Sequence, residues 1–445
     1  MTKTAVLTIV SNNYMPYAAT LLESVRDTNP DYRRYIFLAD RVHEQASLWP
    51  NLADIVEAQA LGIPDFNDMS LRYDIMEFNT AIKPFALKWL FENSDVDHVI
   101  YLDPDIYVYR KLELLDSILA EGCSLVLTPH ITRPLEDNYL PDDHSMLKAG
   151  VFNLGFVAVS RTTDAIRYLD WWGRRLTTQC YSDTSNNLFT DQRWCDLAPC
   201  FVDELRILKD PTYNVAYWNL PHRFPTKEDA SGNIHIEGTP LTFFHFSGLR
   251  LDKAEFVSKH QNRLQWDDIQ PFKQLFTDYR NTLLSNKWSD LSKMKYTYDH
   301  IGNLYVSPVI RRLYRDIFTS VYQELKLDED FVISLCNACS EEHRSESGYR
   351  VTRLMDRIYK ERADLQATFD LATPAGTQAY VVWFEQSAMK EYKLDARVVF
   401  QANIASTEQQ PAFMPVPPLP NADRSFMFRR WRKIRKAMLN RLEKL

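Results

Sequence analysis

The first forty residues constrain the fold more than any other part of the chain. Residues 4–10 form an apolar run typical of a buried strand, and a polar break over 11–14 follows. Residues 16–28 have the spacing of an amphipathic helix, and residues 35–40 form a second buried strand. A strand, a helix and a strand in this order predict a parallel sheet, with its ligand site at the carboxyl ends of the strands.

Polar and aromatic residues follow these two strands. Tyr14 is placed to stack on a nucleotide base, and Ser11, Asn13 and Asp40 are placed to hydrogen-bond to the base or the ribose. The same residue types are common in turns and helix caps. From these residues alone, a structural role is therefore favoured over a binding role.

A second stretch, residues 99–108, adds a pair of carboxylates. A buried strand ends in Asp103-Pro104-Asp105. Two carboxylates in a tight turn can hold a divalent cation against a diphosphate, because Mg²⁺ usually takes one or two carboxylates plus phosphate oxygens. Asp-Pro-Asp is also ordinary turn chemistry. The motif alone leaves a metal site and a plain turn equally open.

Two further groups can complete such a site. The helix predicted over 79–92 carries Lys83, which either faces the phosphates or lies in solvent. The strand predicted over 241–248 delivers His245, a competent third ligand for Mn²⁺, and Gly248, which lets backbone N–H groups approach a phosphate. A histidine in an aromatic strand is more often a core residue with satisfied hydrogen bonds.

The sequence between these groups offers polar residues in apolar surroundings. Asn153 and Gly155 interrupt a strand over 150–159, and a glycine inside a strand often marks close approach of a ligand or another backbone. Asp191 and Gln192 form a polar pair between aromatic residues.

Beyond about residue 262 the pattern becomes helical, with helices predicted over 308–326, 328–340 and 349–370. The sequence predicts four parts, which are an α/β part over 1–262, a mainly helical part over 263–405, a Pro-rich linker over 406–423 and a basic amphipathic helix over 424–445. The last helix suits an anionic membrane surface. Docking on a partner or on the protein itself is the alternative.

Composition narrows the class of protein. No run of 18 apolar residues and no signal peptide occurs, and the six cysteines are scattered, as expected of reduced thiols in a cytoplasmic protein. Cys336 and Cys339 have metal-pair spacing, but no second pair completes a zinc site. The net charge of −7 argues against nucleic-acid binding by the whole chain.

Several motifs follow one another between residue 4 and about residue 260. They are Thr80–Pro84, Tyr101–Asp105, Phe152–Phe156, Asp191–Trp194, Tyr213–Leu220 and His245–Gly248. In this order they resemble the metal-dependent GT-A glycosyltransferases of family 8, the glycogenin and galactosyltransferase type, and more narrowly a bacterial group of predicted glycosyltransferases. The resemblance implies a GT-A fold of the α/β class, a Rossmann-like mixed sheet flanked by helices, here with an added C-terminal helical region.

The resemblance also implies roles by position. Asp103, Asp105 and His245 would bind Mn²⁺ or Mg²⁺, which bridges the two phosphates of the donor. By the same resemblance, Ser11, Asn13 and Tyr14 would lie at the nucleotide base. Lys83 would be the basic residue near the donor, and Gly248 would lie at the diphosphate. Asn153 would touch the donor sugar or sit near the transferred carbon, and Asp191 and Gln192 would lie beneath the reacting face of the sugar.

The chain departs from the family's pattern in two places. Its first strand ends in Val10-Ser11, where many relatives have an acidic residue that reads uracil. The Lys-Pro-Trp pattern usual after the His-x-x-Gly turn is absent from residues 249–253, where Arg250 and Lys253 are the substitutes.

Together these observations favour a cytoplasmic, membrane-associated glycosyltransferase. It would move a sugar from a nucleotide sugar, with a UDP-sugar and a retaining reaction expected, to a glycan or glycolipid acceptor in bacterial surface polysaccharide or lipopolysaccharide synthesis. The helical region would shape the acceptor site or a homo-oligomer interface. The alternatives are an inverting enzyme with Asp191 as base, and a nucleotide-sugar-binding or scaffold protein with an inactive fold. A nucleotidyltransferase would need a Gly-rich phosphate loop near the N-terminus, which the sequence lacks.

Overall fold

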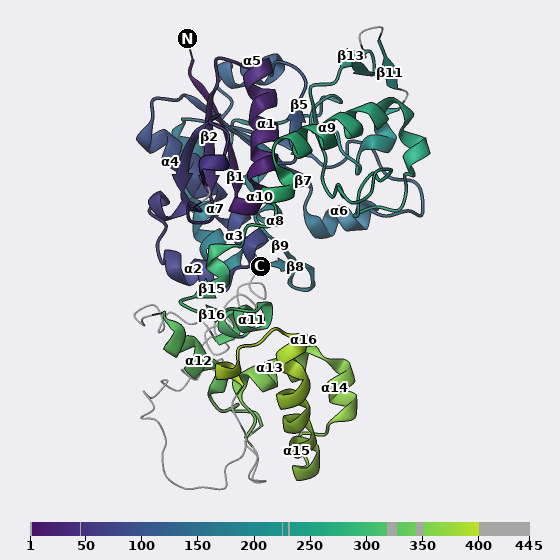
Figure 1. Cartoon of the computed structure of the whole chain (residues 1–445). Coiled ribbons are helices and arrows are strands. Elements are labelled where there is room, and N and C mark those ends of the chain that lie inside the picture. Colours follow the sequence, from purple (N-terminus) through teal and green to yellow (C-terminus); the bar gives the residue numbers. More distant parts are fainter. Residues whose placement is uncertain are drawn as a thin grey trace, which may run out of the picture.

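A seven-stranded sheet forms the centre of the N-terminal half, as the computed structural model shows (Figure 1). The strand order is β10-β6-β7-β4-β1-β2-β3. The strands are β1 (Thr4–Val10), β2 (Arg33–Leu38), β3 (Asp54–Glu57), β4 (His98–Leu102), β6 (Leu125–Pro129), β7 (Phe152–Ser160) and β10 (Leu205–Ile207). Neighbouring strands are parallel, except that β7 runs antiparallel to β4 and to β6.

The structure describes residues 2–44, 46–224, 226–229, 232–317, 327–343 and 350–399. The Pro-rich linker predicted over 406–423 and the basic helix predicted over 424–445 lie outside the described residues. Among the described residues, none of the helices combines the length and the apolar character needed to cross a membrane.

Both faces of the sheet are buried. In β1, Leu7 and Ile9 belong to the core on one face, and Val6 and Val10 belong to the core on the other. This two-sided burial explains why the strand is a continuous apolar run rather than an alternating one.

Helices cover each face of the sheet (Figure 1). On one face lie α1 (Met15–Thr28) and α5 (Glu113–Ala120), and on the other lie α4 (Lys83–Asn93) and α7 (Thr163–Gln179). The predicted α/β class, a mixed sheet flanked by helices, is therefore confirmed.

The single helix predicted over 79–92 is wrong in one respect. The chain forms two helices there, α3 (Ile75–Ala81) and α4, which meet at Ile82. Pro84 lies in the first turn of α4, where its missing N–H costs no hydrogen bond. Lys83 is thereby the first residue of a helix, not an interior one.

The remaining elements before α11 (Pro308–Ile317) lie between or after these strands and helices in the chain. The strands are β5 (Ile106–Val108), β8 (Ser182–Asp183), β9 (Leu188–Phe189), β11 (Thr226–Glu228), β12 (Ile234–Ile236), β13 (Thr239–Pro240), β14 (Phe243–His245), β15 (His300–Ile301) and β16 (Leu304–Tyr305). The helices are α2 (Phe66–Arg72), α6 (Asp143–Ala149), α8 (Gln192–Cys195), α9 (Lys273–Ser285) and α10 (Trp288–Leu291).

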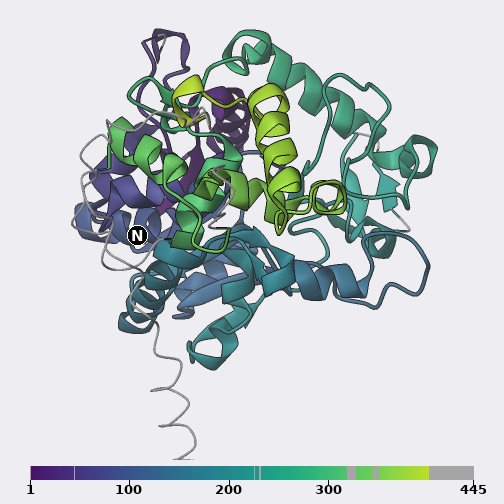
Figure 2. The same ribbon diagram turned by 90° about the horizontal axis from the view of Figure 1, so that it is seen from below.

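A second helical group has its own core. It comprises α11 (Pro308–Ile317), α12 (Glu329–Asn337), α13 (Arg353–Glu361), α14 (Ala363–Thr368), α15 (Pro374–Trp383) and α16 (Met389–Glu391). These helices lie below the sheet in Figure 1 and in front of it in Figure 2. The predicted domain limits stay a prediction. Helix α9 lies within the range 263–405 predicted as the helical part, and its Phe276 packs against Phe244 in a cluster separate from the core of the second helical group.

Arg311 ties the second helical group to the sheet domain. Its Nη1 donates to the carbonyl oxygens of Ser70, Leu71 and Tyr73 at 2.8, 2.9 and 2.8 Å, and the residue is buried. A guanidinium that donates to three buried carbonyl oxygens fixes the orientation of the second helical group relative to the sheet domain.

Candidate active site

Strand pairing brings Asp103, Asp105 and His245 together, although they are far apart in sequence. The two aspartates lie between β4 and β5, and β5 pairs antiparallel with β14, which places His245 opposite Ile106. Two backbone bonds hold the turn, because Asp103 N donates to Gly155 O at 2.7 Å and Phe246 N donates to Asp105 O at 2.8 Å.

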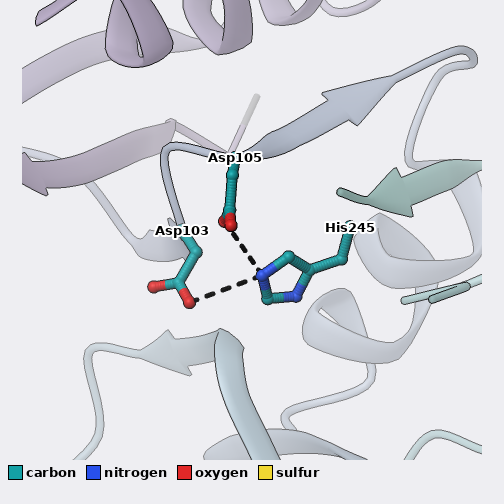
Figure 3. Close-up of side chains that lie close together, drawn as sticks. All are labelled: Asp103, Asp105 and His245. Atoms are coloured by element: carbon teal, nitrogen blue, oxygen red, sulfur yellow. Dashed lines mark ion pairs between the residues drawn. The ribbon is translucent and has the colours of Figure 1, made fainter. Parts of the chain in front are cut away.

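The three side chains converge on one point (Figure 3). Nε2 of His245 lies 2.9 Å from Oδ1 of Asp105 and 3.7 Å from Oδ2 of Asp103. One ligand atom from each residue lies within 4.8 Å of the others. Adjacent ligands of an octahedral ion with bonds of about 2.1 Å lie roughly 3 Å apart, so this donor set fits Mg²⁺ or Mn²⁺.

The charge balance at this point favours a cation. Burial disfavours the imidazolium of His245, but Asp105 and Asp103 outweigh it and raise the pKa of His245 above its ordinary value. Burial also raises the pKa of Asp103, against the opposing effects of Lys83 and His245. Two carboxylates that share a mostly buried corner with one imidazole are stabilised by added positive charge.

Gly155 leaves room for the histidine ring. A Cβ at this position would lie 2.4 Å from Cε1 and 2.8 Å from Nδ1 of His245, and 2.8 Å from Oδ1 of Asn153. The glycine inside β7 therefore marks a close approach, as its position in a strand predicted. Here the approaching group is the side chain of His245.

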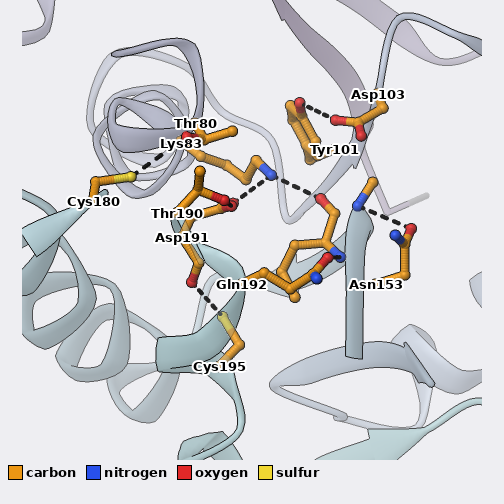
Figure 4. Close-up of polar contacts among 12 residues, drawn as sticks. Thr80, Lys83, Tyr101, Asp103, Asn153, Cys180, Thr190, Asp191, Gln192 and Cys195 are labelled. Carbon is orange, nitrogen blue, oxygen red and sulfur yellow. Dashed lines mark hydrogen bonds and ion pairs between the residues drawn. The ribbon is translucent and has the colours of Figure 1, made fainter. Parts of the chain in front are cut away.

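Lys83 and Asp191 form a buried ion pair beside the aspartates (Figure 4). Nζ of Lys83 lies 2.6 Å from Oδ2 of Asp191, donates to Leu154 O at 2.7 Å and lies 4.1 Å from the ring centroid of Tyr101. The hydroxyl of Tyr101 donates to Oδ1 of Asp103 at 2.5 Å. The solvent-exposed alternative for Lys83 is wrong, since its side chain is 1% exposed.

Gln192 and Asn153 are held by the protein itself. Oε1 of Gln192 accepts from Leu154 N at 3.1 Å, and its Nε2 donates to Ala149 O at 2.8 Å. Oδ1 of Asn153 accepts from Gly155 N at 3.2 Å and from Nδ2 of Asn214 at 3.0 Å. These bonds orient the strand that passes beside the aspartates, and their role toward a sugar stays a prediction.

His130 and Asn214 join this network and were not predicted from the sequence. Nε2 of His130 lies 3.3 Å from Nδ2 of Asn153, and Nδ2 of Asn214 donates to Thr128 Oγ1 at 2.8 Å. The ring of Trp218 lies between the rings of His130 and His245, with centroids at 5.4 and 5.2 Å. The aromatic motif over 213–220 is the sequence signal that points to this region.

The predicted base-binding residues lie at the ends of β1 and β2. Tyr14 is 45% exposed and stacks on Tyr17 with ring centroids 4.8 Å apart. Oγ of Ser11 donates to Oδ1 of Asn13 at 2.8 Å. Asp105 contributes to the raised pKa of Tyr14, after burial, so the tyrosine lies within electrostatic reach of the carboxylate pair.

The carboxylate of Asp40 is occupied by backbone hydrogen bonds. It is fully buried, and its carboxylate accepts from the backbone N–H groups of Asn12, Arg41 and Thr297 at 3.3, 2.9 and 3.0 Å. These bonds link β2 to the segment before α11. The binding role predicted for Asp40 remains untested.

Gly248 makes a tight turn next to a second loop. Its φ is +75°, and a Cβ there would lie 2.4 Å from Oγ of Ser258 and 2.6 Å from Cδ2 of His260. The predicted substitutes for the missing lysine are engaged elsewhere, since Arg250 pairs with Asp252 and Lys253 lies 5.1 Å from the ring centroid of Phe256.

Comparisons with known proteins give distant similarities. No family model matches the chain. The Bacillus subtilis (strain 168) proteins YfnD and YfnF, both described as uncharacterized, are 24% identical over 295 residues and 25% identical over 256 residues. These matches cover 64% of this chain and 89% of YfnD, and 56% of this chain and 82% of YfnF.

The similar solved structures are glycosyltransferases. The galactosyltransferase LgtC, in complex with donor and acceptor sugar analogs, is 16% identical, with 62% of this chain and 95% of that chain covered and a TM-score of 0.38. GlyE of Streptococcus pneumoniae TIGR4 is 17% identical, with 68% and 67% covered and a TM-score of 0.36. At such low identities and TM-scores, the geometry of the site carries the functional argument.

Proposed function

We propose that this protein is a metal-dependent glycosyltransferase that moves a sugar from a nucleotide sugar to a glycan. The observation that carries the proposal is the convergence of Asp103, Asp105 and His245 beside the buried Lys83–Asp191 pair. This combination offers a divalent-cation site and a fixed ammonium at one edge of a Rossmann-like sheet, where ligands of such sheets bind.

The chemistry of sugar transfer uses this arrangement. Breaking the anomeric C–O bond leaves negative charge on a nucleoside diphosphate. Asp103, Asp105 and His245 would hold a divalent ion, which would supply positive charge to that leaving group. Lys83 adds a second positive charge close by, because its ammonium lies over Tyr101, which hydrogen-bonds to Asp103. A rigid, buried ammonium needs little reorganisation as charge develops.

The position of Asp191 supports a retaining reaction over an inverting one. Its carboxylate is 3% exposed and already holds the ammonium of Lys83 at 2.6 Å. A general base must reach the proton of the acceptor hydroxyl. A carboxylate engaged in this way is better suited to stabilise a cation-like sugar or to position Lys83. Gln192 has no acid–base capacity, so the inverting alternative has no second candidate in this pair.

The donor is proposed to be a UDP-sugar, with Tyr14 as the stacking surface for the base. The exposed ring of Tyr14 is backed by Tyr17, which offers a flat platform close to the carboxylate pair. Ser11 and Asn13 lie beside it and offer hydroxyl and amide groups. An aromatic ring stacks on any base, so the Tyr14–Tyr17 pair does not by itself select uracil. The preference for uracil is a separate proposal.

The acceptor is proposed to be a bacterial surface glycan or glycolipid at the inner face of the cytoplasmic membrane. The support is the basic amphipathic sequence over 424–445, which suits an anionic membrane surface and lies outside the described residues. Deleting residues 424–445 should abolish binding to vesicles that contain an anionic lipid while nucleotide binding is kept. Unchanged vesicle binding would contradict this role.

The test of the proposed function is calorimetric titration of UDP and GDP with and without Mn²⁺. We expect one of the two nucleotides to bind only when Mn²⁺ is present. Asp105→Asn should remove that binding, whereas the control Asp54→Asn, at an exposed position of the edge strand β3, should leave it unchanged. Absence of metal-dependent binding in the wild type would refute the proposal. Binding without turnover of any nucleotide sugar would favour the inactive, nucleotide-sugar-binding alternative.

A further inference from the structure

A polar cavity of 660 Å³ lies where the second helical group meets the sheet domain. Its walls come from α3, the β8–β9 hairpin, α11 and Arg357 of α13. The volume is within the range of about 300–1,000 Å³ typical of small-molecule sites. Its lining is unusual in carrying a set of arginines, which are Arg72, Arg311, Arg312, Arg315 and Arg357.

The acidic residues that line the cavity are held by nearby protein groups. Asp74 and Glu77 cap α3 reciprocally, and Oε1 of Glu77 also accepts from Ser182 N at 3.0 Å. Asp183 accepts from Oγ of Ser185 at 2.6 Å and from Nδ2 of Asn186 at 2.8 Å. These three carboxylates are therefore held without a hydrogen bond from Arg315, and the fourth acidic residue of the lining, Asp316, pairs with Arg357.

Most of the arginines are also engaged. Arg312 donates to both carboxylate oxygens of Glu361, at 2.6 and 2.9 Å, and Arg357 donates to Glu361 at 2.8 Å. Arg311 donates to the carbonyl oxygens that join the two parts of the chain. Such arginines form the frame of the cavity and have few donors left for a ligand.

Arg315 differs from the others. Within the part of the chain that the structure describes, no hydrogen bond from its guanidinium is found, and Asp183 approaches it only to 4.0 Å. The guanidinium lies 4.3 Å from the ring centroid of Tyr181, and the side chain is 20% exposed. A guanidinium that rests on an aromatic ring with its donors unengaged is pre-organised to bind an oxyanion in a bidentate manner.

The cavity adjoins the candidate active site through its own walls. Helix α3 leads through Ile82 into Lys83, and the β8–β9 hairpin leads through Thr190 into Asp191. Between them, Oγ1 of Thr80 lies 3.4 Å from Sγ of Cys180, as Figure 4 shows. A ligand in the cavity would thus lie one layer of side chains away from the Lys83–Asp191 pair.

We propose that this cavity binds the anionic group of a saccharide, a phosphate or a carboxylate, and that Arg315 is the residue that contacts it. Oγ of Ser185 and Oδ1 of Asn186, on the hairpin, can accept hydrogen bonds from the hydroxyls of the same sugar while both side chains still donate to Asp183. The identification of this saccharide as part of the acceptor glycan rests on the proposed function. The second helical group then selects an acidic acceptor, because it supplies Arg315.

The test is calorimetric titration of the full chain with glucose 6-phosphate, glucuronate, glucose and inorganic phosphate. We expect at least one of the two anionic sugars to bind saturably and at least about tenfold more tightly than glucose and inorganic phosphate. Glucose 6-phosphate and glucuronate distinguish a phosphate from a carboxylate as the recognised group. Binding of neither sugar, or equally tight binding of inorganic phosphate alone, would overturn the proposal.

Variants assign the binding to Arg315. Arg315→Gln should weaken binding of the anionic sugar at least about tenfold. Arg315→Lys keeps the charge but loses the planar guanidinium, so its affinity should lie between those of the wild type and Arg315→Gln. The control Arg110→Gln, at an exposed position after β5, should bind as the wild type does. Wild-type affinity in Arg315→Gln would refute the assignment.

Nucleotide binding separates this proposal from the proposed function. Arg315→Gln should bind the nucleotide and Mn²⁺ as the wild type does and should melt cooperatively, which shows that the fold is intact. If the protein binds an anionic sugar but shows no metal-dependent nucleotide binding, the cavity site is supported and the proposed glycosyltransferase function is refuted. If the protein shows metal-dependent nucleotide binding but binds no anionic sugar, only the proposal of the cavity site is refuted.

Discussion

Replacing Gly155 with alanine tests whether the ring of His245 must stay where the structure places it. The added methyl group would lie 2.4 Å from Cε1 of His245, about 1 Å inside ordinary van der Waals contact. It would also lie 2.8 Å from Nδ1 of the same ring and 2.8 Å from Oδ1 of Asn153, so two ring atoms and a neighbouring side chain must shift. Overpacking of this kind typically costs about 1–3 kcal/mol.

The consequence for the metal site is larger than the consequence for folding. A metal–nitrogen bond tolerates only about 0.2 Å of displacement, whereas the methyl group forces the ring away by several times that distance. We expect the affinity of Gly155→Ala for Mn²⁺ to fall at least about tenfold, by analogy with the loss of groups that orient metal ligands. The measurement is calorimetric titration with Mn²⁺, with a thermal melt to show that the variant is folded.

A matched control uses the same substitution elsewhere. Gly173 lies inside α7, where a Cβ would meet the far end of the Phe85 ring, with Cζ at 3.2 Å, Cε1 at 3.4 Å and Cε2 at 3.6 Å. Alanine also favours the helix by about 1 kcal/mol over glycine. Gly173→Ala should bind Mn²⁺ as the wild type does. Wild-type Mn²⁺ affinity in Gly155→Ala would refute the reasoning, because it would show that His245 is not a ligand in the position described.

Three further predictions follow from other parts of the site. Lys83→Met leaves the carboxylate of Asp191 buried without its partner and should lower the free energy of unfolding by about 3–5 kcal/mol in urea denaturation. The double variant with Asp191→Asn should recover most of that loss, and no recovery would contradict the pairing. Burial lowers the pKa of His130 to about 4, below its unfolded value near 6.5, so stability should fall by up to about 3 kcal/mol as pH drops through that interval. His130→Gln should flatten this dependence in denaturation measured at pH 7 and pH 5, and an unchanged slope would assign it to other groups. Tyr14→Ala should weaken nucleotide binding by about 1–3 kcal/mol in calorimetry, whereas Tyr139→Ala, at a comparably exposed ring, should leave it unchanged. Equal nucleotide affinities of Tyr14→Ala and the wild type would refute the stacking role.

The sheet was predictable because local patterns determine it. The apolar runs of β1, β4 and β7 are long enough to identify as strands, and the order of strand, helix and strand implies parallel pairing. The boundaries shifted by a few residues, as in β2, which begins at Arg33 and not at Tyr35. The single helix predicted over 79–92 was wrong because apolar spacing continues across Ile82, and the sequence signal for the break is Pro84, which favours the first turn of a helix.

The contacts of the site were less predictable because they join distant parts of the chain. The partner of Lys83 could not be read from the sequence, since Asp191 reaches it only through the packing of α4 against the end of the β8–β9 hairpin. The same holds for Arg315 and Tyr181, which meet where the second helical group contacts the sheet domain. Residue types and spacing indicate a ligand chemistry, but only the packing of helices and strands decides which groups meet.

The most direct measurement is the release of nucleoside diphosphate from a panel of nucleotide sugars, with water as the acceptor of the sugar, in the presence of Mn²⁺ or of excess EDTA. We expect the wild type to release UDP from at least one UDP-sugar with Mn²⁺ and EDTA to stop the release, and we expect Asp105→Asn to fold but to release no UDP. Release that persists in EDTA at the same rate, or release by Asp105→Asn equal to that of the wild type, would contradict the claim that Asp103, Asp105 and His245 form the metal site of a glycosyltransferase.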